Sequence, residues 1–162
     1  MPQLRARAID SSSLLQLGTY TAGGLPLQFP PEIANKDQMI DYFQQWQRNH
    51  TPGEERRYSN PSIGLFGHIT GIALKVEYAD AIETKLLAEL GMNHTFIRVP
   101  PRAMSSYAWG HDSSERAIRV NPGMFDAEAY GIKSTAADMI RFVEANIDPS
   151  TSRGVMRGAW CD

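Results

Sequence analysis

The chain has 162 residues, of which 42% are hydrophobic and 21% are charged, ordinary values for one soluble globular domain with a substantial core. Its net charge of −2 gives no indication of nucleic acid or of an anionic membrane surface as a partner. No apolar run approaches the roughly 18 residues of a membrane span, and a single cysteine, Cys161, excludes an intramolecular disulfide.

The first part of the chain predicts two helices separated by an extended segment. The stretch SSSLLQLGTYTAGG predicts a short helix after a serine cap, closed by Gly23–Gly24. The following LPLQFPPEIAN is extended, because its three prolines cannot lie inside a helix. The stretch DQMIDYFQQWQ predicts an amphipathic helix, since large apolar residues recur at helical spacing. These residues are Met39, Tyr42, Phe43 and Trp46.

A polar pair precedes the third predicted helix. Asn60 is a good N-cap and Pro61 a good first helical residue, and the SIGLFGHITGIALK that follows is apolar nearly all round, as in a buried helix. Tyr58 and Asn60 would then lie at the positive end of that helix, where a phenolate is favoured. Tyr58 could act as a base, and Asn60 could offer a donor and an acceptor to a substrate amide. Alternatively, Asn60 only caps the helix and Tyr58 only packs beneath it.

The second half predicts two more helices and two short strands. The stretch ADAIETKLLAELG predicts a helix that stops at Gly91. Its apolar residues fall on one face: Ile82, Leu86 and Leu90. HTFIRV (94–99) and AIRV (117–120) are the strand candidates, within a long stretch rich in Pro, Gly and Ser. The final helix, STAADMIRFVEAN, opens with Thr135 and Asp138 in the pattern of a capping box. The fold class expected is mainly α with a few short strands (α+β).

Motifs for metals and common cofactors are missing from the sequence. The four histidines do not show metal-ligand spacing such as His-Glu-x-x-His, and there is no phosphate loop or dinucleotide fingerprint. Cys161 lies in the terminal tail with no obvious base near it in the sequence, which disfavours a catalytic thiol. We therefore expect neither a cofactor nor a metal.

Several segments of the sequence resemble segments of one enzyme family. The segment YSNPSIGLFG is similar to the Tyr-x-Asn segment of class C serine β-lactamases, and three other stretches resemble that family at familiar spacing. They are LLQLGTYTAGGLPLQFP, GMNHTFIRVPPRAMSSYAWGH and NPGMFDAEAYGIKSTAADMIRFVEAN. The resemblance runs from about Leu14 to Asn146. It implies the helical domain and long loop of the serine β-lactamase and penicillin-binding fold.

The resemblance assigns roles to four residues. Tyr58 looks like the family's tyrosine that acts as general base or shares a proton with a lysine. Asn60 is similar to the asparagine that hydrogen-bonds the acylamide side chain of a bound β-lactam. Gln28 and Tyr130 match residues that border the same pocket. Without the resemblance, Gln28 would be an exposed loop residue and Tyr130 a loop anchor.

Two family motifs are absent from the chain. No serine lies three residues before any of the four lysines, so the nucleophile motif Ser-x-x-Lys is missing, and so is the Lys-Thr-Gly strand. In the family these motifs lie before and after the part that is present here. We therefore expect a family-like domain over residues 14–147, flanked by unrelated tails at 1–13 and 148–162.

Two functions remain open on these grounds. The chain is either a weakly active β-lactam hydrolase that contributes to bacterial antibiotic resistance or an inactive module that binds a ligand or self-associates. A hydrolase would need a substitute nucleophile, Ser59 or Ser62, or a directly activated water. The family works in the periplasm, whereas MPQLRARAID has no apolar signal-peptide core and suggests a cytoplasmic product. Because the family's helical domain packs on a second domain, we expect an exposed apolar face and a homo-oligomer, with exchanged elements as one possible form.

Overall fold

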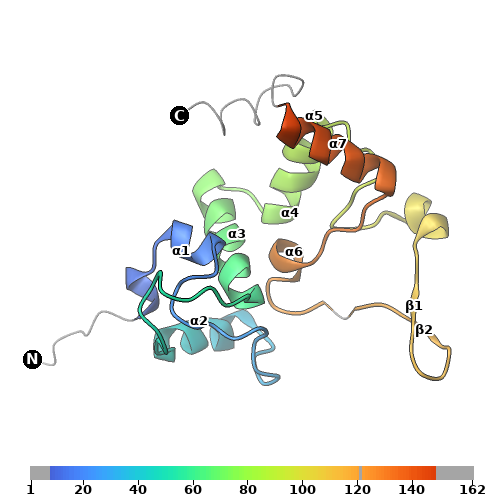
Figure 1. Ribbon diagram of the computed structural model, residues 1–162. Helices are drawn as coiled ribbons and strands as arrows, with labels where there is room; N and C mark the ends of the chain where they lie inside the picture. The colour runs from blue at the N-terminus through green and yellow to red at the C-terminus, as the bar shows by residue number, and fades with distance from the viewer. Residues whose placement is uncertain (1–7, 121, 149–162) are drawn as a thin grey trace, which may run out of the picture. The chain divides into compact units, whose positions relative to one another are not determined.

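The chain divides into two compact units in a computed structural model that describes residues 8–120 and 122–148. Unit 1 comprises the described residues up to Ala73 together with Pro122–Tyr130, and unit 2 comprises the described residues of Leu74–Asn121 and those from Gly131 onward. The chain therefore passes from one unit to the other three times (Figure 1). Among the described residues, no helix has both the length and the apolar character needed to cross a membrane.

Helix α1 (Leu14–Gly18) opens unit 1 after a short 3-10 turn at Ile9–Ser11. Ser13 caps α1 in a complete capping box with Gln16, as the serine run predicts. The helix ends at Gly18, so the prediction that Gly23–Gly24 closes it was wrong. Those two glycines have φ of 109° and 99° and belong to a turn that is bonded through the Gly23 carbonyl to the Asn49 N–H.

Helix α2 (Lys36–Gln45) confirms the predicted amphipathic helix. Asn35 caps its N-terminus, and the Asn35 side chain accepts the Gln38 N–H. Its apolar face supplies Met39 and Phe43 to the core of unit 1, and Trp46 is buried directly after its last residue. The remaining buried members of this core come from α1, from the turn after it and from the segment before α6: Leu17, Ala22, Leu25 and Phe125.

Helix α3 (Asn60–Leu74) is contacted by two other parts of unit 1. An added Cβ at Gly18 would meet the Phe66 ring at 3.7 Å, so the end of α1 lies against α3. An added Cβ at Gly64 would lie only 2.4 Å from the Phe125 Cβ. The glycine is therefore required for the close approach of Phe125, which has a left-handed φ of 61° and precedes α6 (Asp126–Ala129).

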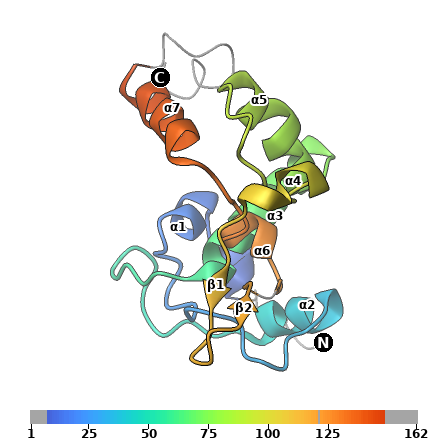
Figure 2. The ribbon, with the colours of Figure 1, turned by 90° about the vertical axis from the view of Figure 1, so that its right-hand side faces the viewer.

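Unit 2 begins with one helical run in three parts. An α-helical turn, α4 (Tyr78–Ala81), continues into a π-helical segment (Ile82–Leu86) and then into α5 (Leu87–Glu89) (Figure 2). The predicted stop at Gly91 is confirmed, with φ of 67°. The wider π turn shifts the buried face, so the buried residues differ from the predicted row of Ile82, Leu86 and Leu90. They are Ala79, Ala81 and Leu87.

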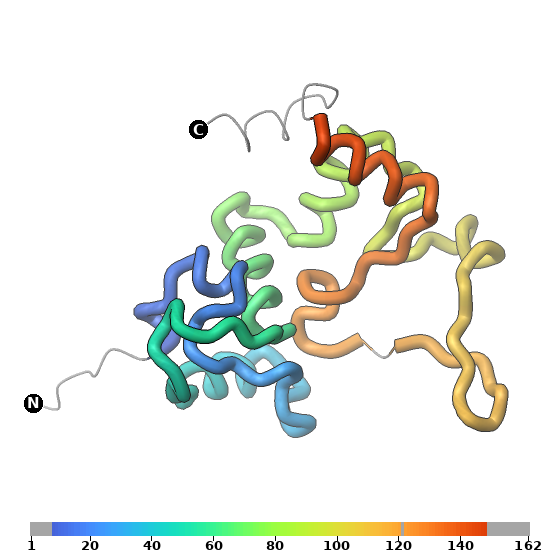
Figure 3. Tube along the Cα trace, viewed as in Figure 1, coloured from blue at the N-terminus to red at the C-terminus, as the bar shows by residue number. Residues whose placement is uncertain are grey.

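The strand predictions are corrected by the structure. HTFIRV does not form a strand with any described residue. Phe96 alone pairs, in a single antiparallel bridge to Lys133 with N···O distances of 2.9 and 2.8 Å. The segments on either side of this bridge can be followed along the trace in Figure 3. A 3-10 helix follows at Pro101–Ser106. The AIRV prediction shortens to β2 (Ala117–Ile118), which pairs with β1 (Gly110–His111) in a small hairpin. The expected fold class, mainly helical with a few short strands, is confirmed.

Helix α7 (Ala136–Ile147) confirms the last predicted helix, but its capping box is only half formed. Thr135 accepts the Asp138 N–H at 3.2 Å as predicted. The Asp138 carboxylate does not return to Thr135; it accepts the His94 N–H at 2.8 Å and the Thr95 hydroxyl at 2.9 Å, and it pairs with Arg141. Large apolar side chains of α7 are exposed: Met139, Ile140, Phe142, Val143 and Ile147.

Candidate active site

Ser59, and not Asn60, caps the helix that carries the predicted site. The Ser59 hydroxyl oxygen accepts the Ser62 N–H at 3.1 Å, the bond that an N-cap side chain makes three residues into a helix. Asn60 is the first residue of α3, so the prediction that it serves as N-cap was wrong. The Asn60 side chain is consequently released from the capping role.

The Asn60 side chain is buried and its carbonyl oxygen has no partner. Only 8% of the residue is exposed, while its backbone N–H donates to the Leu27 carbonyl at 3.0 Å. Among the described residues, Asn60 Oδ1 is the one buried side-chain nitrogen or oxygen without a hydrogen bond. Such an orphan acceptor is costly in a folded protein. A ligand that donates an N–H to this oxygen would remove the cost.

Tyr58 lies two residues before α3 and is 47% exposed. Its ring rests against Tyr20, with ring centroids 4.9 Å apart. The Tyr20 carbonyl accepts the Arg57 N–H at 3.0 Å, and the Arg56 guanidinium lies 5.0 Å from the Tyr20 ring. The phenol of Tyr58 is therefore supported on one side and open to solvent on the other.

Tyr20 contacts the candidate site residue Tyr58, a contact that the sequence did not predict. Its backbone has a left-handed φ of 62°, which turns its ring toward Tyr58, and nothing in the local sequence signals that conformation. Burial and the neighbouring Tyr58 raise the pKa of Tyr20 above its usual value, although Arg56 lowers it. Tyr20 therefore stays protonated near neutral pH, and its hydroxyl remains neutral beside Tyr58.

The hydroxyl groups of the two candidate nucleophiles, Ser59 and Ser62, are buried and already hydrogen-bonded. Ser59 and Ser62 are each 1% exposed. The Ser59 oxygen is occupied by the cap, and the Ser62 hydroxyl donates to the Leu17 carbonyl at 2.9 Å. A nucleophilic serine needs an accessible hydroxyl beside a base. Their placement argues against a catalytic role for either serine.

Gln28 and Tyr130 also belong to unit 1. Gln28 is exposed and follows Leu27, whose carbonyl binds the Asn60 N–H, so the backbone brings Gln28 beside the start of α3. Tyr130 directly follows α6 and is partly exposed. Burial and the Asp126 carboxylate raise the pKa of Tyr130, while a backbone hydrogen bond from Gly123 lowers it. No hydrogen bond or ring contact described in the structure joins Tyr130 to Tyr58, Asn60 or Gln28.

The site combines an unpaired polar atom with an accessible phenol, and none of its described residues is placed as a nucleophile. It offers an unpaired buried acceptor, Asn60 Oδ1, and an accessible phenol, Tyr58, two residues apart. In the part of the chain that the structure describes, no three His, Cys, Asp or Glu residues are grouped to hold a metal ion.

Comparison with known sequences identifies relatives along nearly the whole chain. A family model described as Beta-lactamase matches residues 1–159. A beta-lactamase of Pseudomonas fluorescens is 51% identical over 150 residues, which cover 93% of this chain and 42% of that protein. A beta-lactamase of Escherichia coli (strain K12) is 44% identical over 148 residues, covering 91% of this chain and 39% of that protein. The family match includes residues 1–13 and 148–159, which the sequence analysis had set apart as unrelated.

Solved structures of the same family share the fold. A beta-lactamase/D-alanine carboxypeptidase from Pseudomonas syringae matches with a TM-score of 0.87 and 42% identity, covering 96% of this chain and 44% of that one. A class C beta lactamase from Rhodobacter sphaeroides matches with a TM-score of 0.88 and 40% identity, covering 98% and 45%. The chain thus spans less than half the length of the relatives it matches. It belongs to the beta-lactamase family, and class C enzymes are among the solved structures that share its fold.

Proposed function

We propose that the chain provides the amide-recognition part of a class C β-lactamase site and acts on β-lactams. The observation that carries this proposal is the unpaired, buried Asn60 Oδ1 beside the accessible phenol of Tyr58. In this proposal the Asn60 side chain turns toward the ligand, so that Oδ1, which is buried in the structure, accepts the side-chain amide N–H of a β-lactam and the orphan acceptor is satisfied. Gln28 and Tyr130 would border the acyl side chain of the ligand, in agreement with the family resemblance.

In this proposal Tyr58 takes a proton from a water molecule as the water oxygen bonds to the β-lactam carbonyl carbon, and it returns a proton to the ring nitrogen as the C–N bond breaks. A base must reach the reacting group from an accessible position, and the exposed face of Tyr58 meets that requirement. Tyr20 holds the opposite face of the ring and limits its rotation. The chain does not contain Ser-x-x-Lys, and losing a nucleophile of this kind costs several orders of magnitude in rate. We therefore expect slow turnover by this chain at best.

Binding without hydrolysis is the second candidate function. The specific observation in its favour is the burial of Ser59 and Ser62, whose hydroxyls are already engaged in the helix cap and in a bond to α1. A site of this kind would hold a β-lactam by its amide without forming an acyl-enzyme. In either case the family resemblance leads us to propose the periplasm as the working compartment, which fractionation after osmotic shock would test.

Hydrolysis of a chromogenic cephalosporin by the purified chain separates the two functions. Slow hydrolysis that Tyr58→Phe abolishes would support catalysis, whereas saturable binding without hydrolysis would support the binding module. Intact-mass spectrometry should detect no one-to-one acyl adduct with a slow β-lactam inhibitor. A stoichiometric adduct would contradict the absence of an activated nucleophile, and peptide mapping would then identify the residue.

Asn60→Leu tests the amide-recognition step itself. Leu has a similar volume but cannot accept a hydrogen bond, so the variant removes the orphan oxygen from the buried position. We expect its unfolding free energy to be unchanged or raised, by up to about 1 kcal/mol, while cephalosporin binding falls. Binding equal to that of the wild type would refute the role proposed for Asn60.

A further inference from the structure

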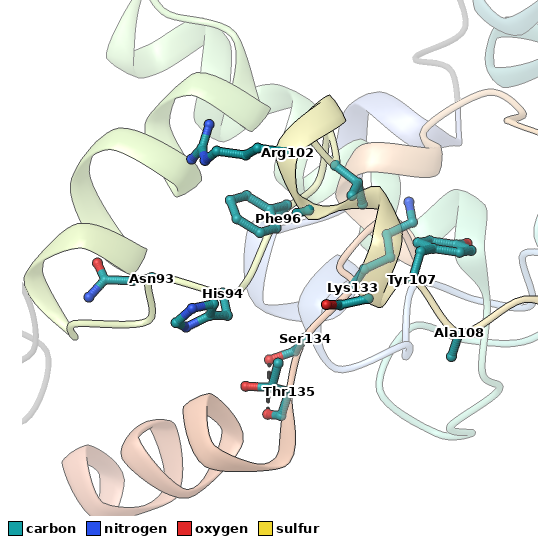
Figure 4. Close-up of a pocket in the computed structure, with 12 residues that line it drawn as sticks. Asn93, His94, Phe96, Arg102, Tyr107, Ala108, Lys133, Ser134 and Thr135 are labelled. Carbon is teal, nitrogen blue, oxygen red and sulfur yellow. Dashed lines mark hydrogen bonds between the residues drawn. The ribbon is translucent and has the colours of Figure 1, made fainter.

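Unit 2 contains a cavity of about 620 Å³ that the β-lactam site does not use. Three segments line it: 93–99, the 3-10 helix with the residues after it, and 133–135 (Figure 4). Its volume lies within the range of pockets that hold small molecules. Tyr58, Asn60, Gln28 and Tyr130 all belong to unit 1, so none of them lines this cavity.

The charged side chains that line the cavity are all basic. Acidic residues outnumber basic ones in the whole chain, 18 to 16, yet no Asp or Glu lines the cavity while Arg102 and Lys133 do. Neither cation has an ion-pair partner among the described residues. Lys133 Nζ donates to the Gly131 and Ile97 carbonyls at 2.6 and 3.4 Å, which fixes the ammonium and leaves one of its three N–H groups free.

Arg102 is held only by an aromatic ring. Its guanidinium lies 5.8 Å from the centre of the Phe96 ring, and it makes no hydrogen bond within the described residues. Arg102 also lines a neighbouring hollow that contains Glu83 and Arg98, but Arg98 already bonds the Glu83 carboxylate there. The donors of Arg102 therefore remain available to a ligand.

Aromatic and hydroxyl side chains complete the wall. Phe96 and Tyr107 line the cavity (Figure 4). Tyr107 also contacts two residues that do not line it: Trp109, at 5.2 Å between ring centroids, and the Arg119 guanidinium, 4.4 Å from the ring. Ser134 adds a hydroxyl that is bonded to Thr95 at 2.8 Å. Flat apolar faces beside two cations fit a molecule with one planar apolar part and one anionic part.

The Asp138 carboxylate does not oppose an anion at this site. It is fully buried, it is not among the lining residues, and it accepts hydrogen bonds from His94 N–H and the Thr95 hydroxyl. Its charge is paired with Arg141.

We propose that this cavity binds a small organic anion whose carboxylate or phosphate is attached to an aromatic ring. The anionic group pairs with the Arg102 guanidinium, and the ring packs against Phe96 beside it. Figure 4 shows the Lys133 side chain at the other end of the cavity, near Tyr107, from where its ammonium adds to the positive potential of the cavity. Charge-assisted hydrogen bonds of this kind are stronger than neutral ones. Binding also neutralises a cation of the cavity wall that has no counter-ion among the described residues.

The test compares two probes of equal shape by calorimetric titration of the whole chain. The carboxylate 2-naphthoate should bind saturably and at least about tenfold more tightly than the neutral 2-naphthamide. Arg102→Met should weaken naphthoate binding severalfold with little effect on the amide, and Lys133→Met should weaken it by a smaller factor. Lys85→Met removes an exposed lysine of unit 2 outside the cavity and should change neither affinity.

Two variants keep the test decisive if a substitution prevents folding or if the probe binds at the β-lactam site. Arg102 makes no described hydrogen bond, so Arg102→Met decides the question if Lys133→Met fails to fold. Asn60→Leu should leave naphthoate binding intact, which separates this cavity from the β-lactam site. The proposal is overturned by equal affinity for the two probes, by the absence of saturable naphthoate binding, or by loss of binding in Asn60→Leu.

Discussion

Replacing Gly64 by Ala places a methyl group where the structure has no room for it. The added Cβ would lie 2.4 Å from the Phe125 Cβ and 2.6 Å from Cδ2 of the same ring. Carbon atoms in contact normally lie about 3.5–4 Å apart. Rotating the Phe125 ring does not relieve the clash, because the nearest atom is attached directly to the main chain.

Two opposing free energies decide the outcome. Ala is favoured over Gly inside a helix by about 1 kcal/mol. Overpacking a core contact that only a backbone shift can relieve costs about 1–3 kcal/mol, and expelling the buried Phe125 side chain would cost about 1.5–3 kcal/mol. Because the 2.4 Å approach is far inside contact distance, we place the cost at the upper end of these ranges, about 3 kcal/mol, so Gly64→Ala should destabilise unit 1 by about 2 kcal/mol net.

Urea unfolding followed by Trp46 fluorescence measures this loss. Trp46 belongs to the buried core of unit 1, and replacing Trp109 and Trp160 by Phe makes it the sole reporter. A slope of about 2 kcal/mol per molar urea converts the expected loss into a midpoint lower by about 1 M. Gly18→Ala is the matched control: its Cβ would meet Phe66 at an ordinary 3.7 Å, so its midpoint should hardly move. A Gly64→Ala midpoint at or above the wild-type value would refute the reasoning.

Ser59→Ala removes the cap of α3 and the acceptor of a buried N–H, so unfolding should show a loss of about 1 kcal/mol; an unchanged midpoint would contradict the capping role. Asp138→Asn should cost about 3 kcal/mol at pH 7. Burial opposes ionisation of Asp138, but hydrogen bonds and Arg141 hold the pKa of its carboxyl below the usual value, so its contribution is complete above about pH 4 and is lost as the pH falls further. The variant should therefore lose less stability in acid, and parallel pH curves would argue against this. We also propose that the exposed apolar face of α7 drives self-association, so Ile140→Lys and Val143→Lys should lower the mass seen by light scattering; a wild-type monomer would contradict this.

The helices were predictable where local signals agree. In α2 and α7 the apolar spacing and a capping side chain, Asn35 or Thr135, point to the same boundaries. At α3 the sequence contains two neighbouring residues that could cap the helix, Ser59 and Asn60. Pro61 is compatible with a helix that begins after either of them. Only the observed Ser59 hydrogen bond distinguishes them, and the difference decides whether Asn60 has a free acceptor.

Features that depend on distant partners were not predictable. The β-branched and aromatic residues of HTFIRV favour a strand, but among the described residues the segment pairs only with Lys133 and has no neighbouring strand. Asp138 was predicted to cap its own helix, whereas its carboxylate bonds residues more than 40 positions earlier. Tyr20 and Phe125 take left-handed conformations that are unusual for their side chains, so neither position was signalled.

The three passages of the chain between the two units restrict how the protein can be divided. Cutting any one passage, at Ala73–Leu74, near Asn121–Pro122 or at Tyr130–Gly131, leaves two covalent connections in place. A single limited-proteolysis cut there would therefore yield two polypeptides, each holding part of a shared unit, which stay together through the packing of that unit until the protein is denatured. Expressing unit 1 alone requires a short linker in place of residues 74–121 and a stop codon after Tyr130, because no simple truncation at either end isolates it.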